Sequence, residues 1–267
     1  ARPLLEQSLN LFRALGDRRG MAGALRDLGW MAWHDGDAAR GEALREEALG
    51  IFRALGDTGQ VAETLWSLGI SVQYRGDYAR ATALYQEGLA LRRARGDVRG
   101  ATQILATLAQ IALHQRDLPA ARVLLTEALS TVRRLDDRWG QAMTLALLGH
   151  VELGAGDLSR ARECFVEAAA LYAALDNLLY LPWCLEGLAG IAVAQSRATD
   201  AAHLCGTREA VLERVGRGLP PADPAGYAGT VAAVRATLGD TAFNAAFEAG
   251  QALPAEKVIA TMVEGER

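Results

Sequence analysis

A turn motif recurs along this chain at a fixed interval of 40 residues. Its last residue is acidic or an amide at every step: Asp17, Asp57, Asp97, Asp137 and Asn177. A second turn falls 20 residues after the first, at Asp37, Asp77, Asp117 and Asp157, and in degraded form at Ser196-Arg197. Glycine before the acid permits the positive φ that ends a helix, and the acid can cap the next one. Two turns in each period predict two helices of about 17 residues.

Apolar residues follow the same period between the turns. One leucine column of the first helices comprises Leu25, Leu65, Leu105, Leu145 and Leu185, and another Leu28, Leu68, Leu108, Leu148 and Leu188. A column of small residues follows at once: Gly29, Gly69, Ala109, Gly149 and Ala189. In the second helices we expect an inward column of Leu44, Leu84, Leu124, Cys164 and Leu204. A single hairpin cannot bury both of its faces, so the pattern predicts an all-α fold, a right-handed superhelix of stacked hairpins (an α-solenoid).

Composition and charge narrow the function classes. The sequence is rich in Ala, Leu, Arg and Glu, which favour helix. A net charge of −4, with Lys257 the only lysine, argues against direct nucleic-acid binding. The sequence contains no run of 18 apolar residues, so it predicts no membrane-spanning helix. Three cysteines without metal-ligand spacing suit a reducing compartment, so we expect a cytoplasmic protein.

The residues of the second period carry a family resemblance. Trp66-Ser67-Leu68-Gly69, Gly76-Asp77-Tyr78, Ala81, Tyr85 and Gly88-Leu89 resemble the tetratricopeptide-repeat (TPR) pattern. That family usually repeats every 34 residues or so and carries a proline near the repeat end. The 40-residue period and the missing proline imply longer helices, as in the TPR variants of large regulators.

The period also predicts the domain organisation. A TPR-like array covers residues 1–216: a half repeat at 1–14, full repeats at about 18–54, 58–94, 98–134 and 138–174, and a degenerate one at 178–216. After the proline-rich stretch 218–224, a C-terminal helical cap is expected over 217–267, with helical patterns at about 223–238, 240–251 and 254–264.

The tail carries a second resemblance. Its LPP-x-D linker and its TLGDTAFNAAFEAGQAL segment are similar to the region that ends the repeats of large bacterial regulators. Those are the maltose-regulator and LuxR-type activators and the STAND signalling ATPases. The resemblance implies an upstream nucleotide-binding switch domain in the same polypeptide. Because the chain begins at Ala1, in mid-repeat and without an initiator methionine, we expect it to be a piece of a longer protein.

The resemblance also implies a ligand groove, since the first helices of such stacks line the concave wall. Its expected lining residues are Arg26, Trp30, Trp33, His34, Glu63, Trp66, Ile70, Gln73, Tyr74, Gln103, Gln110, His114, His150, Trp183 and Glu186. We expect at least one of Trp30 and Trp33 to be exposed, and Trp66 to pack against its neighbours. A Lys/Asn carboxylate clamp is unsupported, because the repeats hold no lysine, although Arg26 could substitute in part.

No catalytic motif occurs, so we expect no enzymatic activity. The histidines lie too far apart along the stack to share a metal, and no cofactor is expected. The leading hypothesis is a sensor module that binds a peptide, protein or small-molecule effector for a larger regulator. The alternative is a scaffold that self-associates through an apolar patch at Leu4, Leu5, Leu9 and Phe12 of the open first hairpin. A third hypothesis, a standalone peptide-pheromone receptor, is less favoured because N-terminal DNA-binding helices are missing.

Overall fold

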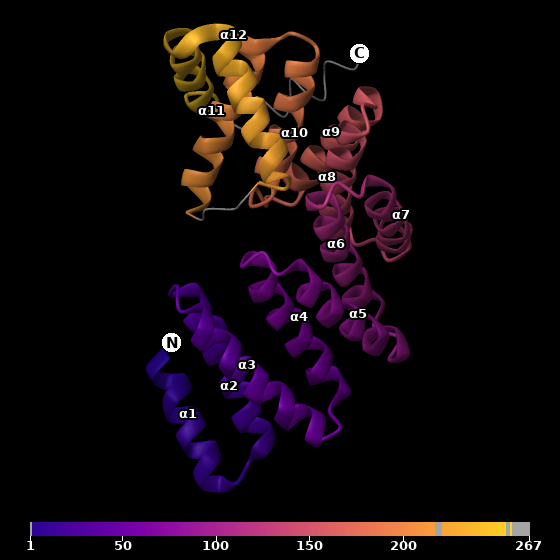
Figure 1. The fold of residues 1–267 in the computed structure, drawn as a ribbon, viewed down its shortest axis with the longest axis vertical. Helices are drawn as coiled ribbons and strands as arrows, with labels where there is room; N and C mark the ends of the chain where they lie inside the picture. The colour runs from indigo at the N-terminus through magenta and orange to yellow at the C-terminus, as the bar shows by residue number, and fades with distance from the viewer. Residues whose placement is uncertain (1, 217–220, 255–256, 258–267) are drawn as a thin grey trace. The chain divides into compact units, whose positions relative to one another are not determined.

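The computed structural model describes residues 2–216, 221–254 and 257 (Figure 1). All regular structure in this part of the chain is helical, and consecutive helices pack as hairpins in the manner of an α-solenoid. This confirms the predicted fold class. The chain forms two compact units, residues 1–104 and 105–267, and the division falls within α6 (Val98–His114).

The first unit contains the half repeat and two full hairpins. Its helices are α1 (Arg2–Leu15), α2 (Arg18–His34), α3 (Ala38–Ala54), α4 (Thr58–Tyr74), α5 (Tyr78–Ala94) and the start of α6. Helices α2 to α5 have 17 residues each, the predicted length. The first of these hairpins spans residues 18–54 and the second spans residues 58–94.

The second unit continues the array and adds a long C-terminal helix. Its helices are the rest of α6, α7 (Leu118–Arg134), α8 (Arg138–Gly154), α9 (Leu158–Ala174), α10 (Leu181–Ala194), α11 (Ala198–Val215) and α12 (Pro224–Gln251). The patterns expected at 223–238 and 240–251 are the two halves of α12, which breaks at Gly239 with φ 72°. The pattern at 254–264 lies largely outside the described residues, and a domain boundary at residue 216 stays a prediction.

The repeated turns have one geometry whatever residue occupies them. The side chain of Asp17 accepts a hydrogen bond from the Gly20 N–H at 2.9 Å, and Asp137 accepts one from Gly140 at 3.0 Å. The residue before each capping acid adopts positive φ. It is glycine in most repeats, but Arg116 (φ 61°) takes the same left-handed conformation. The hairpin geometry therefore outweighs the local preference of the residue at this position.

Helices α3 and α9 each insert one side chain between two successive first helices. The deepest column is Arg45, Tyr85, Leu125, Phe165 and Cys205, one residue later than the expected inward column, in which Cys164 is buried and the four leucines are half-buried. The reason is that α3 packs on both α2 and α4, so its central residue points into the trough between them. The small-residue column makes room for this insertion: a Cβ on Gly69 would lie 2.5 Å from the Tyr85 ring.

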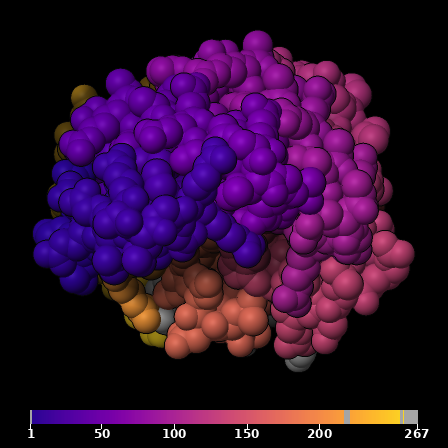
Figure 2. Space-filling model, turned by 90° about the horizontal axis from the view of Figure 1, so that it is seen from below, coloured from indigo at the N-terminus to yellow at the C-terminus, as the bar shows by residue number. Residues whose placement is uncertain are grey.

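Helix α1 is amphipathic and packs one face on α2. Leu9 is buried in that contact, and Leu5 and Phe12 are half-buried. Of the patch expected at Leu4, Leu5, Leu9 and Phe12, Leu4 is exposed as expected, but the expectation is wrong for the other three, which are buried or half-buried. The exposed apolar face of α1 consists instead of Leu4, Leu11 and Leu15, exposed by 67%, 59% and 70%. Figure 2 shows the N-terminal segment, in indigo, at the surface.

Helix α12 closes the second unit by packing on α10 and α11. Val234, Phe243 and Ala246 of α12 join Ala202 and Cys205 of α11 in one buried cluster. The backbones of α11 and α12 approach very closely, because a Cβ added at Gly206 would collide with the Phe247 carbonyl oxygen.

Candidate functional site

Four of the predicted groove residues form an aromatic cluster in the first unit. The ring centroids of Trp30 and Trp33 on α2 lie 5.3 Å apart, and His34 packs edge-on against both indoles, at 4.8 and 4.9 Å. Tyr74, at the end of α4, meets Trp33 at 5.2 Å. Trp30 is 38% exposed and Tyr74 57%, so rings of this cluster reach solvent, as expected for at least one of the two tryptophans. We call Trp30, Trp33, His34 and Tyr74 the aromatic cluster below.

A buried cation lies directly beneath this cluster. The guanidinium carbon of Arg45 sits 5.3 Å from the centroid of the Trp30 ring, although the Arg45 side chain is completely buried. Its Nη1 donates to the Ser67 carbonyl oxygen at 3.1 Å and to the Ser71 hydroxyl. Its Nε and Nη2 have no hydrogen-bond partner among the described residues. Desolvation lowers the pKa of Arg45 to about 10, while the negative charge of Glu42 opposes the fall.

The other predicted residues of the first unit make separate contacts. Arg26 donates to the Gln60 side chain and pairs with Asp27, and Gln73 accepts the Tyr85 hydroxyl at 2.9 Å. Glu63 pairs with Arg92 at 2.6 Å. The remaining predicted groove residues of this unit are partly buried: Ile70, Trp66 and Gln103. The indole N–H of Trp66 has no hydrogen-bond partner among the described residues. Among the described residues of this unit, the ring contacts therefore bring four predicted residues together in one exposed place, the aromatic cluster.

In the second unit the structure buries most of the predicted residues. Gln110 and His114 are half-buried, whereas His150, Trp183 and Glu186 are buried. His150 Nε2 lies 2.8 Å from the Trp183 carbonyl oxygen and donates to it, so Nδ1 is left as an acceptor. Burial lowers the pKa of His150 to about 4, which keeps the imidazole neutral. The described chain itself covers these side chains, so we leave His150, Trp183 and Glu186 out of the proposed contact surface.

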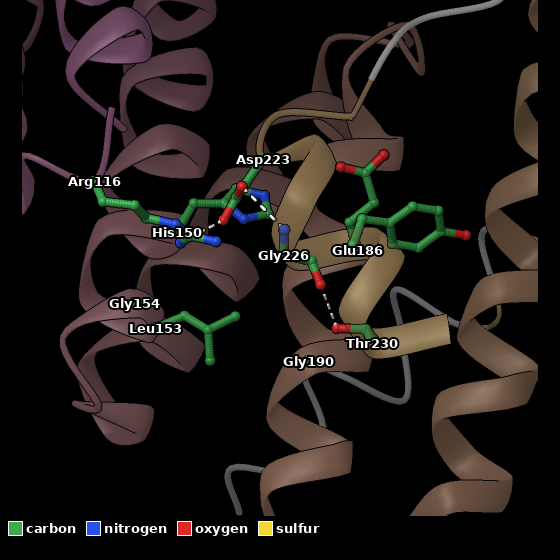
Figure 3. Close-up of a pocket in the computed structure, with 10 residues that line it drawn as sticks. Arg116, His150, Leu153, Gly154, Glu186, Gly190, Asp223, Gly226 and Thr230 are labelled. Carbon is green, nitrogen blue, oxygen red and sulfur yellow. Dashed lines mark hydrogen bonds and ion pairs between the residues drawn. The ribbon is translucent and has the colours of Figure 1, made fainter. Parts of the chain in front are cut away.

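The segment just before α12 contacts Glu186, and the first turns of α12 border a small pocket (Figure 3). Glu186 accepts hydrogen bonds from Arg208 Nε at 2.6 Å and from the Ala222 N–H at 3.0 Å. Asp223 pairs with Arg116 at 2.9 Å and caps α12 through the Gly226 N–H at 3.1 Å. The pocket has a volume of about 230 Å³. Its carboxylates already have partners, so it offers no unbalanced charge to a ligand.

The contacting residues that the sequence analysis missed are Arg45, Ser71, Arg116, Arg208 and Asp223. Arg45 and Ser71 could have been found, because each interrupts an otherwise apolar column at the 40-residue period. Arg208 pairs with Glu186 within the α10–α11 hairpin, and Arg116 pairs with Asp223 just before α12; the 40-residue period predicts neither contact.

The three cysteines are free thiols in the core, and burial raises the pKa of Cys164 and of Cys205 to about 11. That of Cys184 rises further still. These thiols are therefore packing residues. In the described part of the chain no helix is both long and apolar enough to span a membrane.

Fold and site together define a TPR-like helical scaffold with an aromatic surface cluster. The tetratricopeptide-repeat family matches residues 21–94, which contain that cluster and support a TPR domain. No curated protein matches the chain. Among solved structures, BtubC (BKLC) from P. vanneervenii is similar with a TM-score of 0.66 and 20% identity, over 82% of this chain and 92% of that one. A Rap protein, complexed with competence and sporulation factor, is similar with a TM-score of 0.63 and 14% identity, over 100% of this chain and 82% of that one. At these identities the likeness concerns the fold.

Proposed function

We propose that this chain is a binding module that holds a peptide or a segment of a partner protein against the aromatic cluster. The exposure of Trp30 and Tyr74 on a repeat scaffold is the observation that carries this proposal. Aromatic side chains that present a large, rigid surface are the anchors that dominate binding energy at interfaces. The Rap protein of the comparison was crystallised with competence and sporulation factor, which is consistent with ligand binding on this kind of scaffold.

The cluster also fits a sensor role in a larger regulator. A ligand that contacts both α2 and α4 bridges two successive hairpins, and so favours one packing of the hairpins over another. Such a bias could act on an upstream nucleotide-binding domain, the arrangement implied by the tail of the sequence. Among the groove residues expected in the second unit, Gln110 and His114 are the most accessible, and they stay candidate contacts of that unit by itself.

Selection from a displayed random-peptide library, followed by calorimetry on the enriched peptides, tests the binding function. We expect Trp30→Ala to weaken the enriched peptides by about 2 kcal/mol, or roughly thirtyfold, as for an interface anchor. Val123→Ala on α7 is the matched control, because it also shortens an exposed apolar side chain and should leave binding unchanged. If no peptide is enriched, or if Trp30→Ala binds normally, the aromatic cluster is not the binding site.

The exposed face of α1 favours a second candidate function, self-association. Leu4, Leu11 and Leu15 lie along one side of the helix, whereas Leu44 and Ile51 at the equivalent positions of α3 are half-buried against neighbouring structure. If this face mediates oligomers, light scattering should show an oligomer that Leu4→Glu with Leu11→Glu dissociates. Val123→Glu, the charge control, should leave the mass unchanged. A monomer at high concentration would exclude this candidate.

A further inference from the structure

Arg45 and Ser71 place a polar pair where the other repeats are apolar. At the position of Arg45 the later second helices carry Tyr85, Leu125, Phe165 and Cys205. At the position of Ser71 the other first helices carry Met31, Ile111, Val151 and Ile191. The two side chains meet in the first unit, where Nη1 of Arg45 donates to the Ser71 hydroxyl. Where these two successive repeats meet, the chain therefore exchanges core packing for a buried charge.

This exchange is unfavourable for folding. The guanidinium of Arg45 is removed from water, and two of its nitrogens find no acceptor among the described residues. Glu42 is the acid that acts on it, but its carboxylate also pairs with Arg75 at 3.1 Å and Arg80 at 3.3 Å. Departures from a local folding rule that bring no gain in stability are found mainly at functional sites. Because Arg45 lies beneath the aromatic cluster, we infer that the cluster is the functional site concerned.

The buried cation changes what the cluster can bind. An aromatic ring attracts cations to its faces, but the inner face of Trp30 is already occupied by Arg45. The positive charge acts through the ring on its opposite face, where it disfavours a second cation and favours an anion. Apolar contact with the rings remains available at the same place, because Trp30 and Tyr74 are exposed.

We propose that the aromatic cluster recognises a peptide segment in which an apolar or aromatic side chain stands beside a carboxylate. The rings of Trp30, Trp33 and Tyr74 take the apolar side chain, and Arg45 beneath them selects for the negative charge. This proposal rests on the binding function proposed above and names the chemistry of the partner.

The test uses the full chain and a displayed random heptapeptide library. The wild type should enrich sequences that carry Asp or Glu next to a large apolar residue. Each enriched peptide is then synthesised with its acid and, for comparison, with the matching amide. We expect the amide form to bind the wild type about tenfold more weakly, the size of one charge interaction across a ring at intermediate dielectric. The difference should shrink in high salt.

Two variants separate the role of the charge from that of the scaffold. Arg45→Leu should keep the far-UV circular dichroism of the wild type, because Leu125 fills the equivalent position. It should bind the acid and amide forms equally. Arg13→Leu, which removes an exposed arginine of α1, should keep the tenfold preference. Enriched peptides without an acid preference, or an unchanged preference in Arg45→Leu, would overturn this inference alone. Failure of the wild type to enrich any peptide would overturn the proposed binding function as well.

Discussion

Replacing the buried polar pair should stabilise the protein. The pKa of Arg45 falls from its ordinary value to about 10, which at 1.36 kcal/mol per pKa unit corresponds to a penalty of about 3 kcal/mol on the charged form. The guanidinium is charged at neutral pH both before and after folding, so the folded state bears this penalty in full below about pH 10. Above that pH the folded chain releases the proton more readily than the unfolded chain, and the penalty is relieved as pH rises.

Arg45→Leu alone should gain less than the whole penalty. It leaves the buried Ser71 hydroxyl without its donor, which costs about 1–3 kcal/mol, and it also removes the contact of the cation with Trp30. The double variant Arg45→Leu with Ser71→Ile restores the apolar pattern of the other repeats at both positions. We expect it to be more stable than the wild type by about 1–4 kcal/mol, as found when buried charges are replaced by packed apolar side chains.

Urea unfolding at pH 7, followed by circular dichroism and tryptophan fluorescence, measures this difference. Ser71→Ile by itself should destabilise by about 1–3 kcal/mol, because it removes an acceptor from a buried charge. The four proteins form a double-mutant cycle, in which the double variant should be more stable than the sum of the two single changes predicts. A double variant less stable than the wild type would show that the hydrogen bonds and packing of Arg45 outweigh its desolvation, and would refute the reasoning.

Three further predictions concern the second unit. Gly206→Ala should destabilise the protein by more than about 2 kcal/mol, because the added Cβ collides with the backbone at Phe247. Gly229→Ala, in open space on α12, should stabilise it by up to about 1 kcal/mol, and equal urea midpoints for the two variants would contradict the close approach of α11 and α12. His150 has a pKa of about 4 in the folded state and an ordinary one in the unfolded state, so the free energy of unfolding of the wild type should fall by up to about 3 kcal/mol as pH falls from about 6.5 to 4. His150→Gln, which introduces the residue of the preceding repeat, should flatten this pH dependence, and parallel stability curves for the two proteins would exclude His150 as its source. The three thiols should react with Ellman's reagent only after unfolding, and fast labelling of the native protein would contradict their burial.

Sequence periodicity predicts the helices of this protein almost to the residue. The 40-residue spacing of the capping acids fixes where α2 to α5 and α7 to α9 begin, because each acid accepts a hydrogen bond from the third residue after it. It does not fix which residue of a second helix lies deepest. That depends on the trough between two first helices, so the expected column beginning at Leu44 is one residue away from the one beginning at Arg45.

Local pattern determines the repeats of this chain, since capping and helical period act over a few residues. It also identifies Trp30 and Trp33 as candidates for a surface site. Only the tertiary structure decides that the Tyr74 ring meets Trp33, that Arg45 lies beneath the ring of Trp30, and that the segment before α12 bonds to Glu186. Those contacts join residues distant in sequence, and they depend on how whole helices pack rather than on any neighbour along the chain.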